Sequence, residues 1–365
     1  MENGPNRLRD VGKAAALGAF FAASAFGLVA VDAPSPFLLA GVLSGAAFVL
    51  VFREQRRFPD PVRHLGLAII GAGAGALITV GVARRIVDQP APILGAVAAT
   101  LTLTLLAGQV LRFSPAVSTS TAILASVAGG ASGVSAIARE LKADEAIVSA
   151  VQYFRVIIVI ATVSIVAPLV GGTSAPDAEV AGADYDWRNV AMAVGCIGLG
   201  LLAAKWLTFG GSRLILPMLL ATTLTLAGVA AAPVVPSAFL EFSYAVIGLA
   251  VGFSFTPRTL GILARLFPYA VIQLVLGVLA CAAVGVVFAR MVGVSPLDGY
   301  LATTPAGLPA VTAIAVGTPG SDVGLIVTLQ VVRLFAALIL ASAIGTVIRR
   351  RAAKDPGSAH EGGDE

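Results

Sequence analysis

Two arginines lie deep inside long apolar segments, where a charged side chain is unusual. Arg155 and Arg333 each stand about ten residues into such a segment, which at about 1.5 Å per helical residue is roughly 15 Å along a helix. If these segments cross a bilayer, that depth is about half of the hydrocarbon thickness. An arginine there costs about 2.5–3.5 kcal/mol on insertion scales, so we expect it to face a bundle interior, a partner or a water-filled cavity.

Each arginine has a glutamine three positions before it. Gln152 and Gln330 therefore share a helical face with Arg155 and Arg333, and each segment presents a Gln/Arg pair. A planar guanidinium donates two parallel hydrogen bonds to a carboxylate, so the pairs predict a cationic site in which the arginines bind a small anion and the glutamines orient it. The alternative is structural: each arginine would hold backbone carbonyls left free by a broken helix, and one arginine can do both.

Two broken stretches rich in small residues and proline precede these segments, at 114–138 and 295–316. The breaks themselves supply the free backbone groups and lie at residues 126–133 and 304–309. They contain Gly129, Gly130, Pro305 and Gly307. Helix breaks at membrane depth are tolerated only where protein or a water-lined cavity satisfies the backbone. The helix that follows each break offers unpaired N–H groups and a positive dipole end, which favours an anion. A plain kinked helix is the simpler alternative.

Acidic residues stand near the same elements. Asp144 and Asp322 lie about three turns before the arginines, where a carboxylate favours the helix N-terminus, so we predict helix caps rather than an ion-coupling site. Asp298 falls within the second broken stretch and is the better candidate for coupling to an ion, although a solvated loop end is the simpler interpretation.

One offset aligns the two halves of the chain without a gap over this region. It places Asp144 on Asp322, Gln152 on Gln330 and Arg155 on Arg333, and agreement at rare polar positions is more telling than agreement among Leu, Val and Ala. With five crossings in each half, the second half enters the membrane inverted. Inverted repeats with interrupted helices near the midplane are typical of secondary transporters, which is an argument by analogy of fold.

Composition supports a membrane setting for these elements. Of the 365 residues, 58% are apolar and only 12% are charged, against roughly 45–50% and 25% in soluble domains. This excludes a soluble globular protein and a disordered or collagen-like chain. Cys196 and Cys281 both lie within apolar runs, which excludes a disulfide scaffold or a CxxC zinc site. We expect no metal and no cofactor.

Apolar runs of membrane-spanning length predict an all-α polytopic fold of about ten transmembrane helices in two inverted repeats, each with a re-entrant Gly/Pro-broken segment. The expected parts are a cytoplasmic N-terminus at 1–10, a first repeat at 11–170, an acidic extracytoplasmic linker at 171–188, a second repeat at 189–348 and a disordered cytoplasmic tail at 349–365. The expected crossings are 11–31, 36–52, 65–83, 92–111, 146–170, 190–208, 214–231, 239–256, 266–289 and 324–348.

The distribution of basic residues favours ten crossings with both termini cytoplasmic. It leaves few Lys or Arg residues on the outer side, whereas twelve crossings would place more of them there. The outer basic residues are Arg84, Arg85, Arg188 and Arg290.

Two small-residue motifs predict close helix contacts. Gly71 and Gly75 in the first half, and Gly248 and Gly252 in the second, form G-x-x-x-G faces. The sequence leaves open whether these faces meet helices of the same chain or of a second subunit in a homo-oligomer.

The doubled pattern resembles the AbrB-type duplicated bacterial membrane family over about residues 11–350. The pattern is a Gly-rich break, an Asp and then Gln-x-x-Arg, and the first half departs from it with Val127 where the second half has Pro305. Members are labelled either ammonia monooxygenases or AbrB-family regulators. A copper or iron oxygenase needs clustered His, Cys or carboxylate ligands, and this sequence has only His64 and His360, so we do not expect an enzyme.

The resulting hypothesis is a secondary transporter of a small anionic solute in the bacterial cytoplasmic (inner) membrane, working by alternating access. The alternative is a membrane-embedded sensor that regulates gene expression indirectly. The lipid bilayer is the expected partner and nucleic acid is not, because the basic residues are accounted for by topology.

Overall fold

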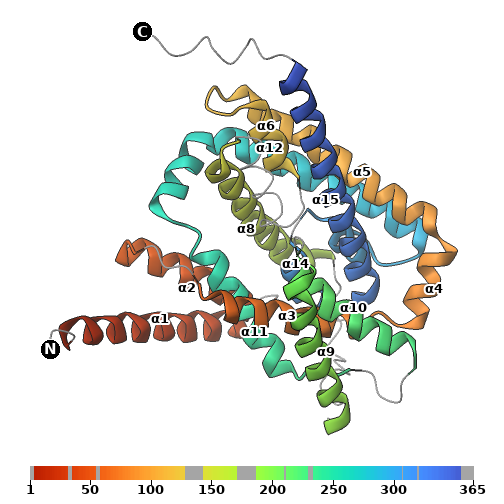
Figure 1. Ribbon diagram of the computed structural model, residues 1–365, viewed down its shortest axis with the longest axis horizontal. Helices are drawn as coiled ribbons and strands as arrows, with labels where there is room; N and C mark the ends of the chain where they lie inside the picture. The colour runs from red at the N-terminus through yellow and green to blue at the C-terminus, as the bar shows by residue number, and fades with distance from the viewer. Residues whose placement is uncertain are drawn as a thin grey trace.

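The computed structural model is all-α, and no strand occurs among the residues that it describes (Figure 1). The structure describes residues 4–31, 35–54, 58–127, 143–170, 186–208, 211–228, 233–305, 307–318 and 320–354. Gly129, Gly130, most of the predicted linker and the end of the predicted tail lie outside these ranges.

The described helices of the first half are α1 (Gly4–Ala30), α2 (Pro36–Phe52), α3 (Asp60–Ala76), α4 (Val80–Asp88), α5 (Pro90–Gly108), the 3-10 helix η1 (Gln109–Phe113), α6 (Thr119–Ser126) and α8 (Glu145–Val170). Those of the second half are α9 (Trp187–Trp206), α10 (Ser212–Leu226), α11 (Ser237–Gly252), α12 (Pro257–Val292), α13 (Pro296–Thr303), α14 (Leu308–Val316) and α15 (Val323–Lys354).

Four of the described helices are long and apolar enough to cross a membrane. The qualifying segments are Gly12–Ala30, Pro90–Phe113, Trp187–Trp206 and Pro257–Val292. Shorter apolar helices accompany them, including α2, α10 and α11. Length and composition together make the chain an all-α membrane protein.

Several predicted boundaries are wrong. The crossing expected at 65–83 is divided, because α3 ends at Ala76 and a new helix, α4, begins after Thr79, whose side chain accepts from the Val82 N–H. Helix α1 begins at Gly4, ahead of the crossing expected at 11–31, and α15 continues past 348 to Lys354, into the segment expected to be a disordered tail. The predicted linker extends to residue 188, but α9 already begins at Trp187, and the Asp186 side chain caps it.

Glycine faces bring helices of the two halves into backbone contact. On α3, a Cβ atom at Gly71 or Gly75 would collide with a carbonyl oxygen of α10. On α11, a Cβ atom at Gly248 or Gly252 would collide with a carbonyl oxygen of α2. Both G-x-x-x-G faces are therefore covered within one chain, and a homo-oligomer contact through them would require these helix pairs to separate.

The second broken stretch, 295–316, forms two short helices, α13 and α14, and α14 lies near the centre of the molecule (Figure 1). The chain leaves helical conformation between Thr303 and Leu308, and Pro309 lies in the first turn of α14. Helix α13 packs tightly on α12, where the backbones approach at Gly285 and Gly299 and the Thr303 hydroxyl donates to the Cys281 carbonyl at 2.9 Å. In turn, α14 contacts α3 and α8 of the first half and α11 and α15 of the second.

Candidate anion-binding cavity

A cavity of about 240 Å³ lies between helices of both halves. It is lined by both predicted Gln/Arg pairs, with Gln152 and Arg155 from α8 and Gln330 and Arg333 from α15. The N-terminus of α14 contributes Gly307, Leu308, Pro309 and Ala310. The charged side chains that line the cavity are all arginines, and among its described lining residues there is no carboxylate, so its electrostatic potential favours an anion.

On α8, the predicted pair lies buried with donors to spare. The side chains of Gln152 and Arg155 are 4% and 8% exposed. Neither Nε2 of Gln152 nor Nε of Arg155 has a hydrogen-bond partner. An unsatisfied buried donor costs about 1–3 kcal/mol, and more when it is charged, so both groups would gain from an acceptor brought within reach.

On α15, the equivalent pair holds the broken helix. Gln330 donates from Nε2 to the Leu301 carbonyl at 2.8 Å and to the Thr304 carbonyl at 3.2 Å. Arg333 donates from Nη1 to the carbonyls of Thr303 at 2.9 Å and Thr304. These are the carbonyls released where α13 ends, so the structural alternative describes what Arg333 does here.

The break itself contributes a backbone wall to the cavity. Gly307 is the residue that caps α14, and its carbonyl accepts from the N–H groups of Ala310 and Val311. Outside the described residues lie two predicted break residues of the first half, Gly129 and Gly130. Pro305 is buried but is not among the lining residues, whereas Gly307 is. The positive end of the α14 dipole is therefore directed at the cavity.

Two lining side chains escaped the sequence-based prediction. Arg63 of α3 lies at the cavity edge and donates to Asp60 at 2.8 Å, and this bond and the charge of Arg63 hold the pKa of the Asp60 carboxyl below its usual value. Tyr153 of α8 lines the cavity with its ring packed edge-on against Phe255, at a centroid distance of 6.4 Å. The spacing of Asp60 and Arg63 signals an ion pair on one helix face, but no local pattern shows that this face meets a cavity.

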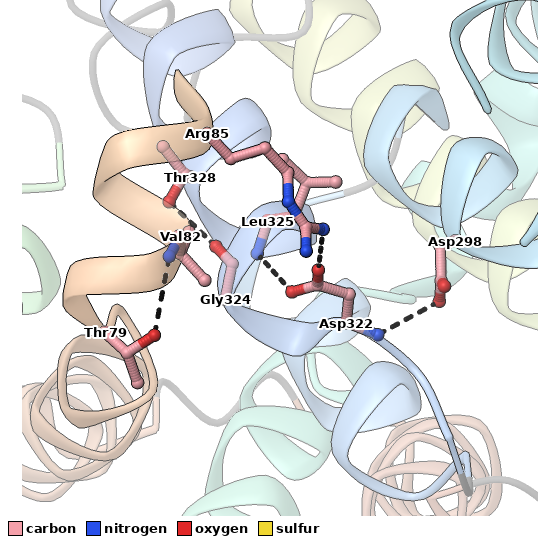
Figure 2. Close-up of polar contacts among 8 residues, drawn as sticks. All are labelled: Thr79, Val82, Arg85, Asp298, Asp322, Gly324, Leu325 and Thr328. Carbon is pink, nitrogen blue, oxygen red and sulfur yellow. Dashed lines mark hydrogen bonds and ion pairs between the residues drawn. The ribbon is translucent and has the colours of Figure 1, made fainter. Parts of the chain in front are cut away.

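Asp298 and Asp322 are not among the lining residues of the cavity, and both lie at helix starts (Figure 2). Asp322 caps α15 by accepting from the Leu325 N–H at 3.1 Å, and its other oxygen accepts from Arg85 of α4 at 2.7 Å. Asp298 is 4% exposed and accepts from the Asp322 N–H at 3.3 Å. The interpretation of Asp298 as a solvated loop end is therefore wrong, because this residue is buried in the first turn of α13.

The first half repeats this arrangement with different side chains. Asp144 caps α8 by accepting from the N–H groups of Ala146 and Ile147 at 2.9 and 3.1 Å. Its own N–H donates to the Thr121 hydroxyl of α6 at 3.1 Å, as the Asp322 N–H does to Asp298 of α13. Aligning the two halves pairs Asp144 with Asp322 and so predicts both caps. It does not predict that Thr121 and Asp298 accept equivalent hydrogen bonds, because their side chains differ.

The fold and the site together define an all-α membrane protein in which both halves of the chain contribute a Gln/Arg pair to one cavity. The chain belongs to the AbrB family: the family model described as "Transition state regulatory protein AbrB" matches residues 37–349. A protein of Escherichia coli (strain K12), named "Putative regulator AbrB", is 25% identical over 342 residues, which is 90% of this chain and 94% of that protein.

Proposed function

We propose that this protein is a secondary transporter of a small anionic solute. The observation that carries the proposal is the cavity between the two halves, in which the buried Arg155 guanidinium keeps an unused donor and no carboxylate is among the described lining residues. A cation buried in this way is unfavourable unless an anion completes it. Arg155 and Gln152 bind the anion, and the N-terminus of α14 faces it.

The transport cycle is alternating access between two inverted repeats. Reciprocal packing supports this proposal, since α2 contacts α11 while α3 contacts α10, and α1 contacts α2 while α9 contacts α10. If α1, α2 and α3 are exchanged for α9, α10 and α11, the α2–α11 contact becomes the α10–α3 contact. In the same way, the α1–α2 contact becomes the α9–α10 contact. Such two-fold related packing around interrupted helices suits a mechanism in which one bundle rocks against the other.

The proposed location is the bacterial cytoplasmic membrane, with both termini in the cytoplasm. The basic residues at helix ends support this orientation. In it, Arg63 near the start of α3 and Gly211 near the start of α10 lie toward the cytoplasm, and both line the cavity. The cavity therefore takes up its solute from the cytoplasmic side in this conformation. No catalytic step is part of the proposal.

A regulatory role is the second candidate, favoured by the names of the family model and of the Escherichia coli protein. In this version the same cavity binds an anion, but the protein signals its presence without moving it. Binding alone is common to both roles, so flux is the measurement that separates them.

The experiment is uptake of radiolabelled anions into proteoliposomes containing the purified full chain. Carboxylates of different size, phosphate and sulfate are supplied outside, with the unlabelled anion inside to drive exchange. We expect saturable exchange of at least one anion, and its loss in Arg155→Gln. An Arg290→Gln variant, altered at the last turn of α12, is the control and should keep full exchange. Exchange of no anion, or equal exchange by Arg155→Gln, contradicts the proposal.

A further inference from the structure

Resting on the proposed function, we infer that the solute is a monocarboxylate with a short apolar chain. The cavity combines one available guanidinium with a largely aliphatic wall. The donors fix the anionic end of the ligand, while the wall fixes the chemistry of the remainder.

The anionic end is matched to a single carboxylate. Nε of Arg155 and Nε2 of Gln152 are buried donors without partners. The second Gln/Arg pair is engaged with the chain, because Gln330 and Arg333 donate to carbonyls at the end of α13. One planar guanidinium beside one amide suits the two oxygens of one carboxylate.

Much of the cavity's lining is aliphatic and comes from several helices. It includes Leu38 and Val42 of α2, Leu67 of α3, Leu214 of α10, and Ile247 and Val251 of α11. An alkyl chain against such a wall gains about 0.8 kcal/mol for each methylene group it buries, which corresponds to roughly fourfold in affinity. A second charged group there would lose its hydration without gaining a partner.

Additional charges on the solute are disfavoured by the remaining polar groups. An ammonium group would find arginines and no carboxylate among the described lining residues. A second carboxylate would need a second available cation, and Arg63, at the cavity edge, is already bonded to Asp60 at 2.8 Å. Amino acids, dicarboxylates and inorganic dianions should therefore bind less tightly than a monocarboxylate of equal size.

The test compares ligands of nearly equal size that differ by one charged group. Butyrate, 2-aminobutyrate, succinate and phosphate compete with labelled butyrate for the purified protein in detergent and for exchange in proteoliposomes. We expect butyrate to compete at least about tenfold better than the other three, and affinity to rise about fourfold per methylene from acetate to butyrate. Arg155→Gln should abolish these differences.

A wall variant tests the apolar contact separately. Leu67→Ala enlarges the cavity and should shift the optimum toward a longer chain, whereas Leu94→Ala, at a 60% exposed position on α5, should leave it unchanged. If Leu67→Ala does not fold, the chain-length series on the parent protein decides alone. Succinate, 2-aminobutyrate or phosphate competing as well as butyrate overturns this inference while the transporter proposal stands. Exchange of no anion at all overturns both.

Discussion

Arg155 and Arg333 occupy matching positions in the two halves, but their guanidinium groups have different surroundings. Arg333 donates to the carbonyls of Thr303 and Thr304 at the end of α13. Nε lacks a partner in both side chains, but among the described residues no carbonyl accepts from Arg155 as Thr303 and Thr304 accept from Arg333. The duplicated residues thus differ: one holds a broken helix, and the other lines the cavity without such bonds. A residue that binds a ligand is expected to contribute less to the free energy of unfolding than a residue that holds the fold together.

Thermal stability should distinguish the two arginines. Arg333→Gln removes charge-assisted bonds to buried carbonyls, which should cost about 1.5–3 kcal/mol and lower the melting temperature in detergent by several degrees. Arg155→Gln removes a buried charge that lacks a partner at Nε, so its melting temperature should stay equal or rise. Equal losses in both variants would contradict the separation of roles.

Contacts between helices depend on helix caps, on helix breaks and on glycines, which let two backbones approach closely. Glycine faces let α3 meet α10 and α2 meet α11 at backbone distance. The sequence predicts these motifs and the break at 304–309, because both are local patterns. It does not predict the division of α3 from α4, or that α12 continues through Pro268, because neighbouring helices decide which irregularities are tolerated.

Substitution of a contact glycine should destabilise the fold far more than substitution of an exposed one. Gly75→Ala directs a methyl group into the carbonyl of Met218 and should cost about 1–3 kcal/mol. Gly195→Ala on α9 has open space around it and should be neutral or stabilising by up to about 1 kcal/mol. Melting temperatures measure both. A stable Gly75→Ala protein would mean that α3 and α10 are not in backbone contact.

The cap of α15 should matter more than its ion pair. Asp322→Asn keeps an acceptor for the Leu325 N–H but loses the charge that Arg85 binds, and should cost less than about 1 kcal/mol because the pair is partly exposed. Asp322→Ala loses the cap as well, which should cost about 0.5–2 kcal/mol more. Asp144→Ala, which removes only the cap of α8, is the matched comparison. Equal melting temperatures for both Asp322 variants would show that the cap is not stabilising.

On the scale of the whole molecule, the two halves meet around the cavity, and each supplies one Gln/Arg pair. The sequence predicts these four residues because they are rare polar positions that the duplication repeats. It does not predict Arg63 in the cavity or Arg85 on Asp322, because those contacts depend on how distant helices pack. The division of roles between the arginines is hidden for the same reason: identical motifs give no sign of what surrounds them.

Access to the cavity should be one-sided in this conformation. Val251→Cys places a thiol on the lining, whereas the native Cys196 and Cys281 are buried and give a low background. A charged thiol reagent should label Val251→Cys from the side on which α3 begins, and butyrate should protect it. Arg85→Gln should increase labelling from the opposite side, because it releases α4 from α15. Equal labelling from both sides in the unaltered background would contradict alternating access.

Arg155 is the side chain proposed to bind an anion in the cavity. The most direct test is equilibrium binding of labelled butyrate to the purified protein, compared among the parent, Arg155→Gln and Arg155→Lys. Loss of a charge-assisted contact worth about 1.5–3 kcal/mol predicts affinity about 10- to 100-fold weaker for Arg155→Gln. Arg155→Lys should lie between, because lysine keeps the charge without the planar pair of donors. The same affinity in all three proteins would contradict the account.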